Sequence, residues 1–489
     1  MTIFELLALG VGVSVLSLIA LITAVLVVPK AFEDHEFPGP KPHSYLLGSL
    51  GDCQPGLTLE YFLKLQKEYG NNFRVWLLHR KLIVIADPED AKFCLITKRL
   101  PKYVGAYYSF RGLLGEGLLT TAEEKHNKQR RAIASLFNKD LLRRLHEFVE
   151  VEIEKLVEIL DSAAAAKKSI NIDECFQKFT SDVLGRTIFG TQLNLQSGVD
   201  DSFVSKANAA LQNVNWIYAF YPLSKLYGRP EKLLNANKLV KGKCVELMEA
   251  RRREDPLEKA NRPTDLLDVL LSNKDASDDY IVDELATFLL AGQETSAHGF
   301  SFVVFELAQN EKVAAKVAEE ANSVLSSGRN VATYDQVSSL KYADQVWKET
   351  LRIRSPAANG TYRIADRDYT LPSGAHLKKG DQIAVVSGLL HHSKDHWKDP
   401  DVFDPDRFSE ERSRGRHPLA FAPFSSGPRN CIGQFFASHE GVVTLASLCK
   451  RYRFELDHDP KKIVNYGDVT LRPSTRKGEP LLVRVHMRE

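Results

Sequence analysis

The segment Phe424-Ser425-Ser426-Gly427-Pro428-Arg429-Asn430-Cys431-Ile432-Gly433 places one cysteine at the expected start of a helix. Arg429 stands two residues before this cysteine, and a helix N-terminus and a nearby cation both favour a thiolate over a thiol. Gly427 and Gly433 allow the backbone to approach a flat, bulky group, and amides of the loop can donate hydrogen bonds to the sulfur. Cys431 could therefore be a nucleophile, a metal ligand or a buried small residue.

The composition around this segment is that of a folded protein. The chain has 489 residues, of which 44% are hydrophobic and 26% charged, and this balance argues against a disordered or low-complexity protein. A net charge of +2 argues against nucleic acid as the main partner, because phosphate binding usually needs a strong basic excess. The six cysteines contain no CxxC pair, so they indicate neither a disulfide framework nor a zinc module.

The N-terminus contains an uncharged apolar run. Residues 6–28 lie between Glu5 and Lys30 and contain no Asp, Glu, Lys or Arg. As a helix rising about 1.5 Å per residue, the run spans roughly 34 Å, enough to cross a hydrocarbon core of about 30 Å. No basic residue precedes it, which argues against a signal peptide and places the body in the cytosol by the positive-inside bias. We expect residues 1–30 to form a membrane anchor, the alternative being a buried helix of the soluble core.

The rest of the chain is expected to form a hinge and one domain. Pro38, Pro40 and Pro42 block helix and central strand, so residues 31–44 are predicted to be a stiff proline-rich hinge. Residues 45–489 show no repeat and no second linker, which predicts a single domain of α+β type, mainly helical. Helices are expected over 59–69, 89–97, 123–161, 173–190, 231–254, 263–272, 281–309, 311–326, 334–354 and 432–452, and strands over 82–86, within 361–388 and after 452.

Four motifs in one order resemble those of the cytochrome P450 family. Residues 424–433 match F-x-x-G-x-R-x-C-x-G, its heme-binding loop, at every fixed position. Residues 291–295 (Ala-Gly-Gln-Glu-Thr) resemble its oxygen-activation motif, Glu349 and Arg352 its E-x-x-R pair, and residues 403–408 its F-x-P-x-R-F segment. The hinge is similar to the proline-rich stretch of microsomal members. The resemblance covers nearly the whole chain and implies the cytochrome P450 fold behind an N-terminal transmembrane helix.

The resemblance implies heme b, with the Cys431 thiolate as the axial ligand of the iron. The implied reaction is a monooxygenation that inserts one oxygen atom of O2 into a lipophilic substrate. Glu294 and Thr295 then form an acid–alcohol pair that can deliver protons. Gly292 leaves room for dioxygen, the structural alternative being close helix packing.

The family also implies a structural salt bridge and cations for the heme propionates. Glu349, Arg352 and Arg407 are expected to form a buried triad that stabilises the fold. His126 stands where the family has Trp, so its N–H can donate to a propionate, with a pH sensitivity near neutrality. The remaining cofactor-binding residues predicted from the resemblance are Arg130, Arg363, Arg429, Phe424, Gly433 and Gly292.

The family's recognition segments predict a pocket of large apolar side chains, which suits a lipophilic guest with few charges. For any single residue, plain core packing is the alternative. The nearest subfamily resemblance is to animal cholesterol 24-hydroxylases, and shared motifs with fatty-acid hydroxylases leave a sterol, a fatty acid or a terpenoid open. The predicted wall residues are Tyr107, Tyr108, Phe110, Leu114, Trp216, Phe220, Phe288, Ala291, Ala358, Thr361 and Val469.

The electrons are expected to come from another protein. The chain has neither a GxGxxG segment after a strand nor clustered cysteines, so no flavin or iron–sulfur site is indicated. With the anchor, this implies NADPH-cytochrome P450 reductase at the endoplasmic reticulum membrane, with cytochrome b5 as a second candidate and a role in lipid or sterol metabolism. Candidates for a basic docking face are Lys128, Arg131, Arg143, Arg144, Arg412, Arg414, Arg416, Lys450 and Arg451.

Two other functions stay open. One is a heme-thiolate isomerase or dehydratase that acts on hydroperoxides without a reductase, although such chemistry does not need the protons that Glu294 and Thr295 can deliver. The other is a catalytically silent sterol-binding membrane protein.

Overall fold

The computed structural model describes residues 15–18, 36–42, 48–49, 51–77, 80–198, 229–325, 328–467 and 469–488. The expected anchor therefore lies outside the described residues, apart from a helical stretch at 15–18. No helix within the described ranges is both long and apolar enough to cross a membrane. Part of the expected hinge is described, and its Pro38 carbonyl accepts a hydrogen bond of 2.8 Å from the amide of Arg74, which holds it against the first strand.

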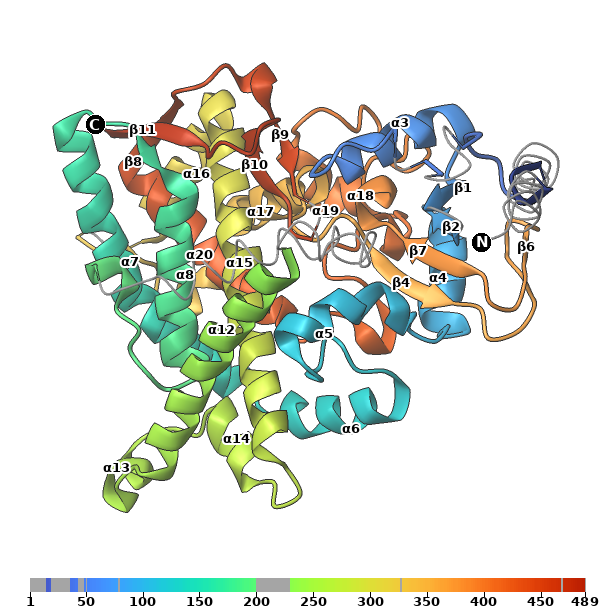
Figure 1. The fold of residues 1–489 in the computed structure, drawn as a ribbon. Coiled ribbons are helices and arrows are strands. Elements are labelled where there is room, and N and C mark those ends of the chain that lie inside the picture. The colour runs from blue at the N-terminus through green and yellow to red at the C-terminus, as the bar shows by residue number, and fades with distance from the viewer. Residues whose placement is uncertain are drawn as a thin grey trace, which may run out of the picture.

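Helix α15 (Asp278–Gln309) runs through the helical part of the molecule, with α7 (Lys139–Ala166) and α8 (Ile172–Ile188) on one side (Figure 1). It begins at Ser277, whose side chain accepts from the amide of Tyr280, and two aspartates in its first turn favour the positive end of the helix dipole. Most of its side chains are buried around the whole circumference, as expected of a helix in a protein core. Polar residues on this helix are consequently removed from water.

The other helices surround α15. The stretch 123–161, expected to be helical throughout, forms two helices: α6 (Glu123–Ala134) ends before Ser135, and α7 begins at Lys139, capped by Asn138. Its side chain accepts hydrogen bonds from the amides of Asp140 and Leu141. The remaining helices are α3 (Thr58–Tyr69), α4 (Pro88–Lys92), α5 (Tyr108–Leu114), α12 (Arg229–Arg252), α13 (Pro256–Asn261), α14 (Leu266–Ser272), α16 (Glu311–Val324), α17 (Lys341–Ile353), α18 (Ser387–Leu390), α19 (Glu410–Ser413) and α20 (Gln434–Arg451).

Small sheets complete the fold (Figure 1). The largest sheet has four strands in the order β1-β2-β7-β4: β1 (Asn72–Leu77), β2 (Arg80–Ile85), β7 (Gln382–Val385) and β4 (Thr361–Ile364). Strands β2 and β7 are parallel, and the other two neighbouring pairs are antiparallel. A second sheet has three strands in the order β3 (Ile170–Asn171), β11 (Leu482–Met487) and β8 (Tyr452–Leu456). Two further sheets have two strands each: β10 (Arg472–Thr475) pairs with β9 (Ile463–Tyr466), and β5 (Tyr369–Thr370) pairs with β6 (His376–Leu377). The sheet that contains β1 and β2 lies away from α7 and α8, and the sheet that contains β8 and β11 lies close to α7 (Figure 1). The expected mainly helical α+β fold is confirmed.

A buried salt bridge joins α17 to the segment that leads to the cysteine loop. The Arg352 guanidinium binds the Glu349 carboxylate through two hydrogen bonds of 2.7 and 2.8 Å, and both side chains are fully buried. Arg352 also donates to the carbonyls of His391 and Pro400, at 2.9 and 2.8 Å. Arg407 lies 3.4 Å from the same carboxylate. These three residues therefore meet as one buried group that holds distant loops against α17.

We predict that Glu349→Gln destabilises the protein by about 3 to 5 kcal/mol, because two buried guanidinium groups then lack a counter-charge. Chemical denaturation of the heme-loaded protein measures the loss. The matched control is Lys348→Gln on the same helix, which removes a half-exposed pair with Asp344 and should cost less than about 1 kcal/mol. Equal losses in the two variants would contradict the role of the triad.

Candidate functional site

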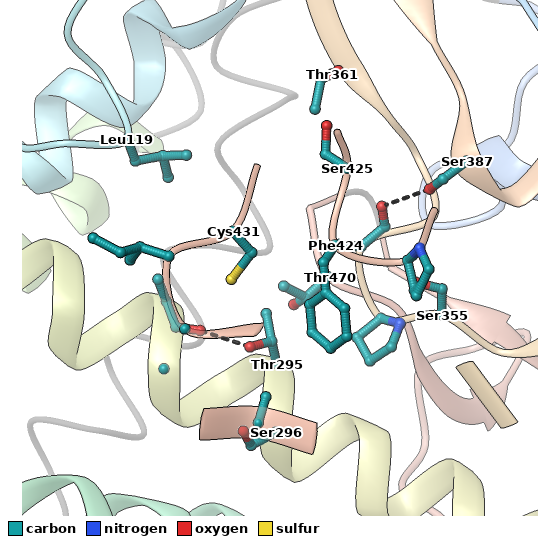
Figure 2. Close-up of a pocket in the computed structure, with 18 of the residues that line it drawn as sticks. Leu119, Thr295, Ser296, Ser355, Thr361, Ser387, Phe424, Ser425, Cys431 and Thr470 are labelled. Atoms are coloured by element: carbon teal, nitrogen blue, oxygen red, sulfur yellow. Dashed lines mark hydrogen bonds between the residues drawn. The ribbon is translucent and has the colours of Figure 1, made fainter. Parts of the chain in front are cut away.

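An apolar cavity of about 430 Å³ lies between α15 and the loop that carries Cys431. Figure 2 shows the Cys431 sulfur pointing into this space from one side and Thr295 of α15 lying on the other. Phe424, at the start of the loop, forms part of the wall beside them. The cavity can therefore hold a bulky apolar group in contact with one thiol.

Most of the predicted wall residues within the described ranges line this cavity. Those that do so are Tyr107, Phe110, Leu114, Phe288, Ala291, Thr361 and Val469. Two others lie elsewhere: Tyr108 begins α5 with 59% of its surface exposed, and Ala358 is buried beside Gly388. Trp216 and Phe220 lie outside the described residues.

Several residues that line the cavity are not indicated by the sequence. Leu184 and Ile188 come from α8, and Leu119 from the turn before α6. In the sequence they have the spacing of ordinary core residues. Only the packing of α8 against α15 turns one of its faces toward the cavity, so no local signal could have found them.

The cysteine loop has a backbone that closes on itself. The amide of Cys431 donates a hydrogen bond of 2.9 Å to the carbonyl of Phe424. Gly427 has a φ of +77°, and a Cβ there would collide with the carbonyl of Leu95, so only glycine fits. Helix α20 begins just after the cysteine, at Gln434. The loop thereby aims one sulfur at the cavity.

The protonation of Cys431 differs from the expectation that the thiolate is favoured. The Cys431 side chain is exposed toward the cavity, and desolvation by the apolar surroundings raises the pKa of its thiol, while the amide of Gly433 and the charge of Arg130 act in the opposite direction without overcoming it. Desolvation thus outweighs the helix terminus and the cation. A metal ion bound to the sulfur displaces the proton, so this cysteine suits metal ligation better than free nucleophilic catalysis.

Two buried cations, Lys102 and Arg363, and the partly buried Arg429 lie close together near the cavity and are called here the cation cluster. Burial and then the charges of Arg429 and Arg363 lower the pKa of Lys102 well below its usual range. The nearby carboxylate is Glu123, which is more than half exposed and 3.7 Å from Arg429. Buried positive charge without full compensation is unfavourable. The cluster consequently fits a ligand that brings negative charge, as the two propionates of heme do.

Lys102 is the member of this cluster that the sequence analysis did not identify. Its ammonium group donates to the carbonyl of Leu119 and lies 3.4 Å from the ring centre of Tyr107. Both of those residues line the cavity. In the sequence, a single lysine after Pro101 does not indicate an anion-binding site. Its burial beside two arginines, which only the structure shows, gives it that significance.

His126 is buried beside the cation cluster and does not titrate near neutrality as expected. Burial and then the charge of Arg429 lower its pKa to about 4, while its contact with Asn127 opposes the shift. The imidazole is therefore neutral at physiological pH in this structure. A neutral imidazole still carries one N–H that can donate to an anion.

Arg130 points to the cysteine loop. Its guanidinium donates two hydrogen bonds of 2.7 Å, one to the carbonyl and one to the side-chain oxygen of Asn430, the residue before Cys431. Its charge also acts on the Cys431 sulfur. This geometry braces the loop and differs from the expected approach to a propionate.

The middle of α15 forms the wall opposite the cysteine. A Cβ at Gly292 would lie 2.9 Å from the Leu184 side chain, so this glycine permits close packing of α15 on α8, as well as contributing to the cavity. The Thr295 hydroxyl donates to the carbonyl of Ala291 at 2.7 Å. Burial raises the pKa of Glu294 to about 7. An acid that can hold or release a proton near neutrality thus lies next to an alcohol at the cavity wall.

Comparison with known proteins agrees with this arrangement. Residues 38–478 match the family model described as Cytochrome P450. Cytochrome P450 4X1 of Rattus norvegicus is 30% identical over 440 residues, which cover 86% of this chain and 85% of that protein. Cytochrome P450 4d2 of Drosophila melanogaster is 28% identical, with 88% and 90% covered, and cytochrome P450 3A11 of Mus musculus is 26% identical, with 87% and 86% covered.

Proposed function

The chain belongs to the cytochrome P450 family, and we propose that it is a membrane-anchored member that oxidises a lipophilic substrate with electrons from an external NADPH-dependent reductase. As a member of this family it is a monooxygenase with heme b as its cofactor, and it requires dioxygen and a redox partner. One observation carries the proposal: across a single apolar cavity, a cysteine sulfur faces an acid–alcohol pair, with buried cations close by.

In this proposal the Cys431 thiolate would hold the heme iron, and a heme held by a thiolate would supply the activation of dioxygen. The cation cluster and the neutral His126 would bind the propionates, since the charges of the cluster lack full compensation and the imidazole can donate one N–H. Arg130 holds the loop in position through Asn430. Phe424 and Gly433 line the cavity on the same side and allow a flat group to approach.

On the opposite wall, Glu294 and Thr295 would deliver protons into the cavity that Cys431 faces. Glu294 supplies the proton because its pKa of about 7 leaves it partly protonated at neutral pH. Thr295 presents its hydroxyl at the cavity surface. Gly292 lets α15 lie close to α8 and keeps this stretch of helix free of a side chain.

The substrate is proposed to be a lipophilic molecule such as a sterol, a fatty acid or a terpenoid. The described walls of the cavity are mainly aliphatic and aromatic, with Glu294 and Arg429 as the charged residues among them. Both charged residues already have roles in proton delivery and propionate binding. The enclosed part of a substrate is therefore expected to be uncharged. A sterol substrate, which the resemblance to cholesterol 24-hydroxylases suggests, stays a prediction.

The reductase is proposed to approach the face of α6 and the cysteine loop. Lys128 and Arg131 are exposed on α6, next to the Arg130 contact with the loop. Several of the other basic residues proposed for docking form ion pairs within the chain: Arg412 with Asp404, Arg414 with Glu410, and Arg451 with Asp161. The proposed docking face therefore contains fewer unpaired basic residues than the sequence alone indicates. Cytochrome b5 is a second candidate partner for the same face.

The domain organisation is proposed from the sequence. Residues 1–30 form a single-pass anchor in the endoplasmic reticulum membrane, residues 31–44 the hinge, and residues 45–489 one catalytic domain that faces the cytosol. The apolar run at 6–28 and the basic residues after it support this arrangement.

The first prediction from this function concerns the iron ligand. Cys431→Ala should abolish the thiolate-type spectrum of the ferrous carbon monoxide complex, because no other sulfur faces the cavity among the described wall residues. The matched control is Cys449→Ala, which changes a buried cysteine of α20 and should leave the spectrum unchanged. A thiolate spectrum retained by the Cys431 variant would reject the assignment.

The second prediction separates a monooxygenase from an isomerase. A panel of sterols, fatty acids and terpenoids is screened for ligands that shift the Soret band, and the strongest ligand is then incubated with NADPH and reductase. We expect oxygenated product that depends on both components. Conversion of a fatty-acid hydroperoxide without NADPH or reductase, and no NADPH-dependent product, would favour the isomerase instead.

The third prediction concerns the anchor. The full chain should stay with the membranes of the expressing cells through high-salt and alkaline washes, because a spanning helix built from the uncharged residues 6–28 is held by lipid. A chain that begins at residue 31 should be released to a much larger extent. Release of the full chain by salt alone would show that charge, and not a spanning helix, holds it.

A further inference from the structure

Glu294 and His298 form a buried polar group on the same face of α15. They are four residues apart on one helix, so their side chains are neighbours. Each is only 1% exposed. Neither carboxylate oxygen of Glu294 and neither ring nitrogen of His298 makes a hydrogen bond of normal geometry to the described residues, although the Thr470 side chain lies near enough to Glu294 to lower its pKa in part. Four such atoms in one place are unusual in a native core and point to ordered water between them.

Asp173, in the first turn of α8, continues this line toward the surface. Its carboxylate lies 3.7 Å from Nε2 of His298, too far for a direct hydrogen bond and close enough for one bridging water. Ser301 and Gln177 donate to the same carboxylate at 2.8 and 2.7 Å and fix its orientation. The Asp173 side chain keeps 7% of its surface exposed, and Glu174 beside it is open to solvent. Three titratable groups thus connect the cavity wall to the outside.

The charges around this line suit proton movement. Asp173 on α8 and Arg472 on β10 act on both Glu294 and His298. Burial lowers the pKa of His298 to about 4, so the imidazole is neutral at pH 7 and has one nitrogen free to accept a proton. Glu440 of α20 lies across the helix near Ser296, where burial raises its pKa to about 8, so it adds little negative charge at neutral pH.

We propose that Asp173 and His298 form a proton path that recharges Glu294 from solvent. This inference rests on the proposed role of Glu294 as the proton donor at the cavity. Each transfer breaks one O–H or N–H bond and forms another, and no electron moves along the path. His298 accepts a proton on one ring nitrogen and releases a proton from the other, through bound water where the groups do not touch. Protons consumed with the two electrons from the reductase are thereby replaced one at a time.

His298 touches neither the substrate nor the heme in this proposal, so it is a relay residue and its test must exclude a merely structural role. The measurement is infrared spectroscopy of the resting, heme-loaded full chain at pH 5, where Glu294 is protonated. The carbonyl stretch of this carboxylic acid is identified by its loss in Glu294→Gln. After rapid mixing with D2O, the shift of the band reports how fast the Glu294 proton exchanges with solvent.

We expect His298→Phe and His298→Gln to slow this exchange at least tenfold, and Asp173→Asn to slow it as well. Glutamine keeps a polar side chain in the same place but does not carry a transferable proton, so it separates a relay from simple packing. If His298→Phe does not fold, His298→Gln and Asp173→Asn decide the question. The matched control is His146→Gln, a similarly buried histidine on α7, which should exchange as the parent does.

Exchange as fast in His298→Gln as in the parent would overturn the proposal, because the imidazole is then not needed for the proton. The measurement involves no oxygen, reductase or substrate. Slowed exchange in a protein that fails the NADPH test would refute the proposed function and leave the path standing. Normal NADPH-dependent turnover with unaltered exchange would refute the path and leave the function standing.

Discussion

The buried pair of Glu349 and Arg352 is the interaction on which the site depends. Arg352 donates to the His391 carbonyl, and the ring of His391 in turn accepts a 3.0 Å hydrogen bond from the amide of Ala422, two residues before the cysteine loop begins. The loop is thereby connected to α17 through one histidine. A buried ion pair gains little stability over apolar packing, but breaking one is costly, so the pair acts mainly as a specific lock.

Basic side chains lie near one side of the cavity, and the acid Glu294 lies on the other. Burial, and then repulsion by the neighbouring arginines, lowers the pKa of Lys102. On the far wall, burial keeps Glu294 partly protonated. Desolvation likewise raises the pKa of Cys431 at the cavity wall. The buried cations become favourable when an anionic ligand is bound, and the thiolate of Cys431 when a metal ion is bound, whereas Glu294 is held partly protonated by burial itself.

Motif spacing identified the centre of the site and little of its surroundings. Cys431, Glu294 and Thr295 were identified because their neighbours along the chain make the chemistry recognisable. Lys102 was missed because its role comes from two arginines more than two hundred residues away in the sequence. The helical stretch expected over 123–161 is interrupted between Ala134 and Lys139, where the Asn138 side chain caps a new helix despite a continuing apolar spacing. The approach of Asp173 to His298 depends entirely on how α8 packs on α15.

The sequence by itself determined the local chemistry of this protein: a glycine that permits a left-handed turn, a cysteine before a helix, and an acid beside an alcohol in an apolar helix. These features depend on backbone sterics and on residues within one or two turns. Only the tertiary structure decided which polar groups lose their water and which charges they face. Burial is produced by segments distant in the chain, and it is burial that sets the protonation of Glu294, His126 and His298.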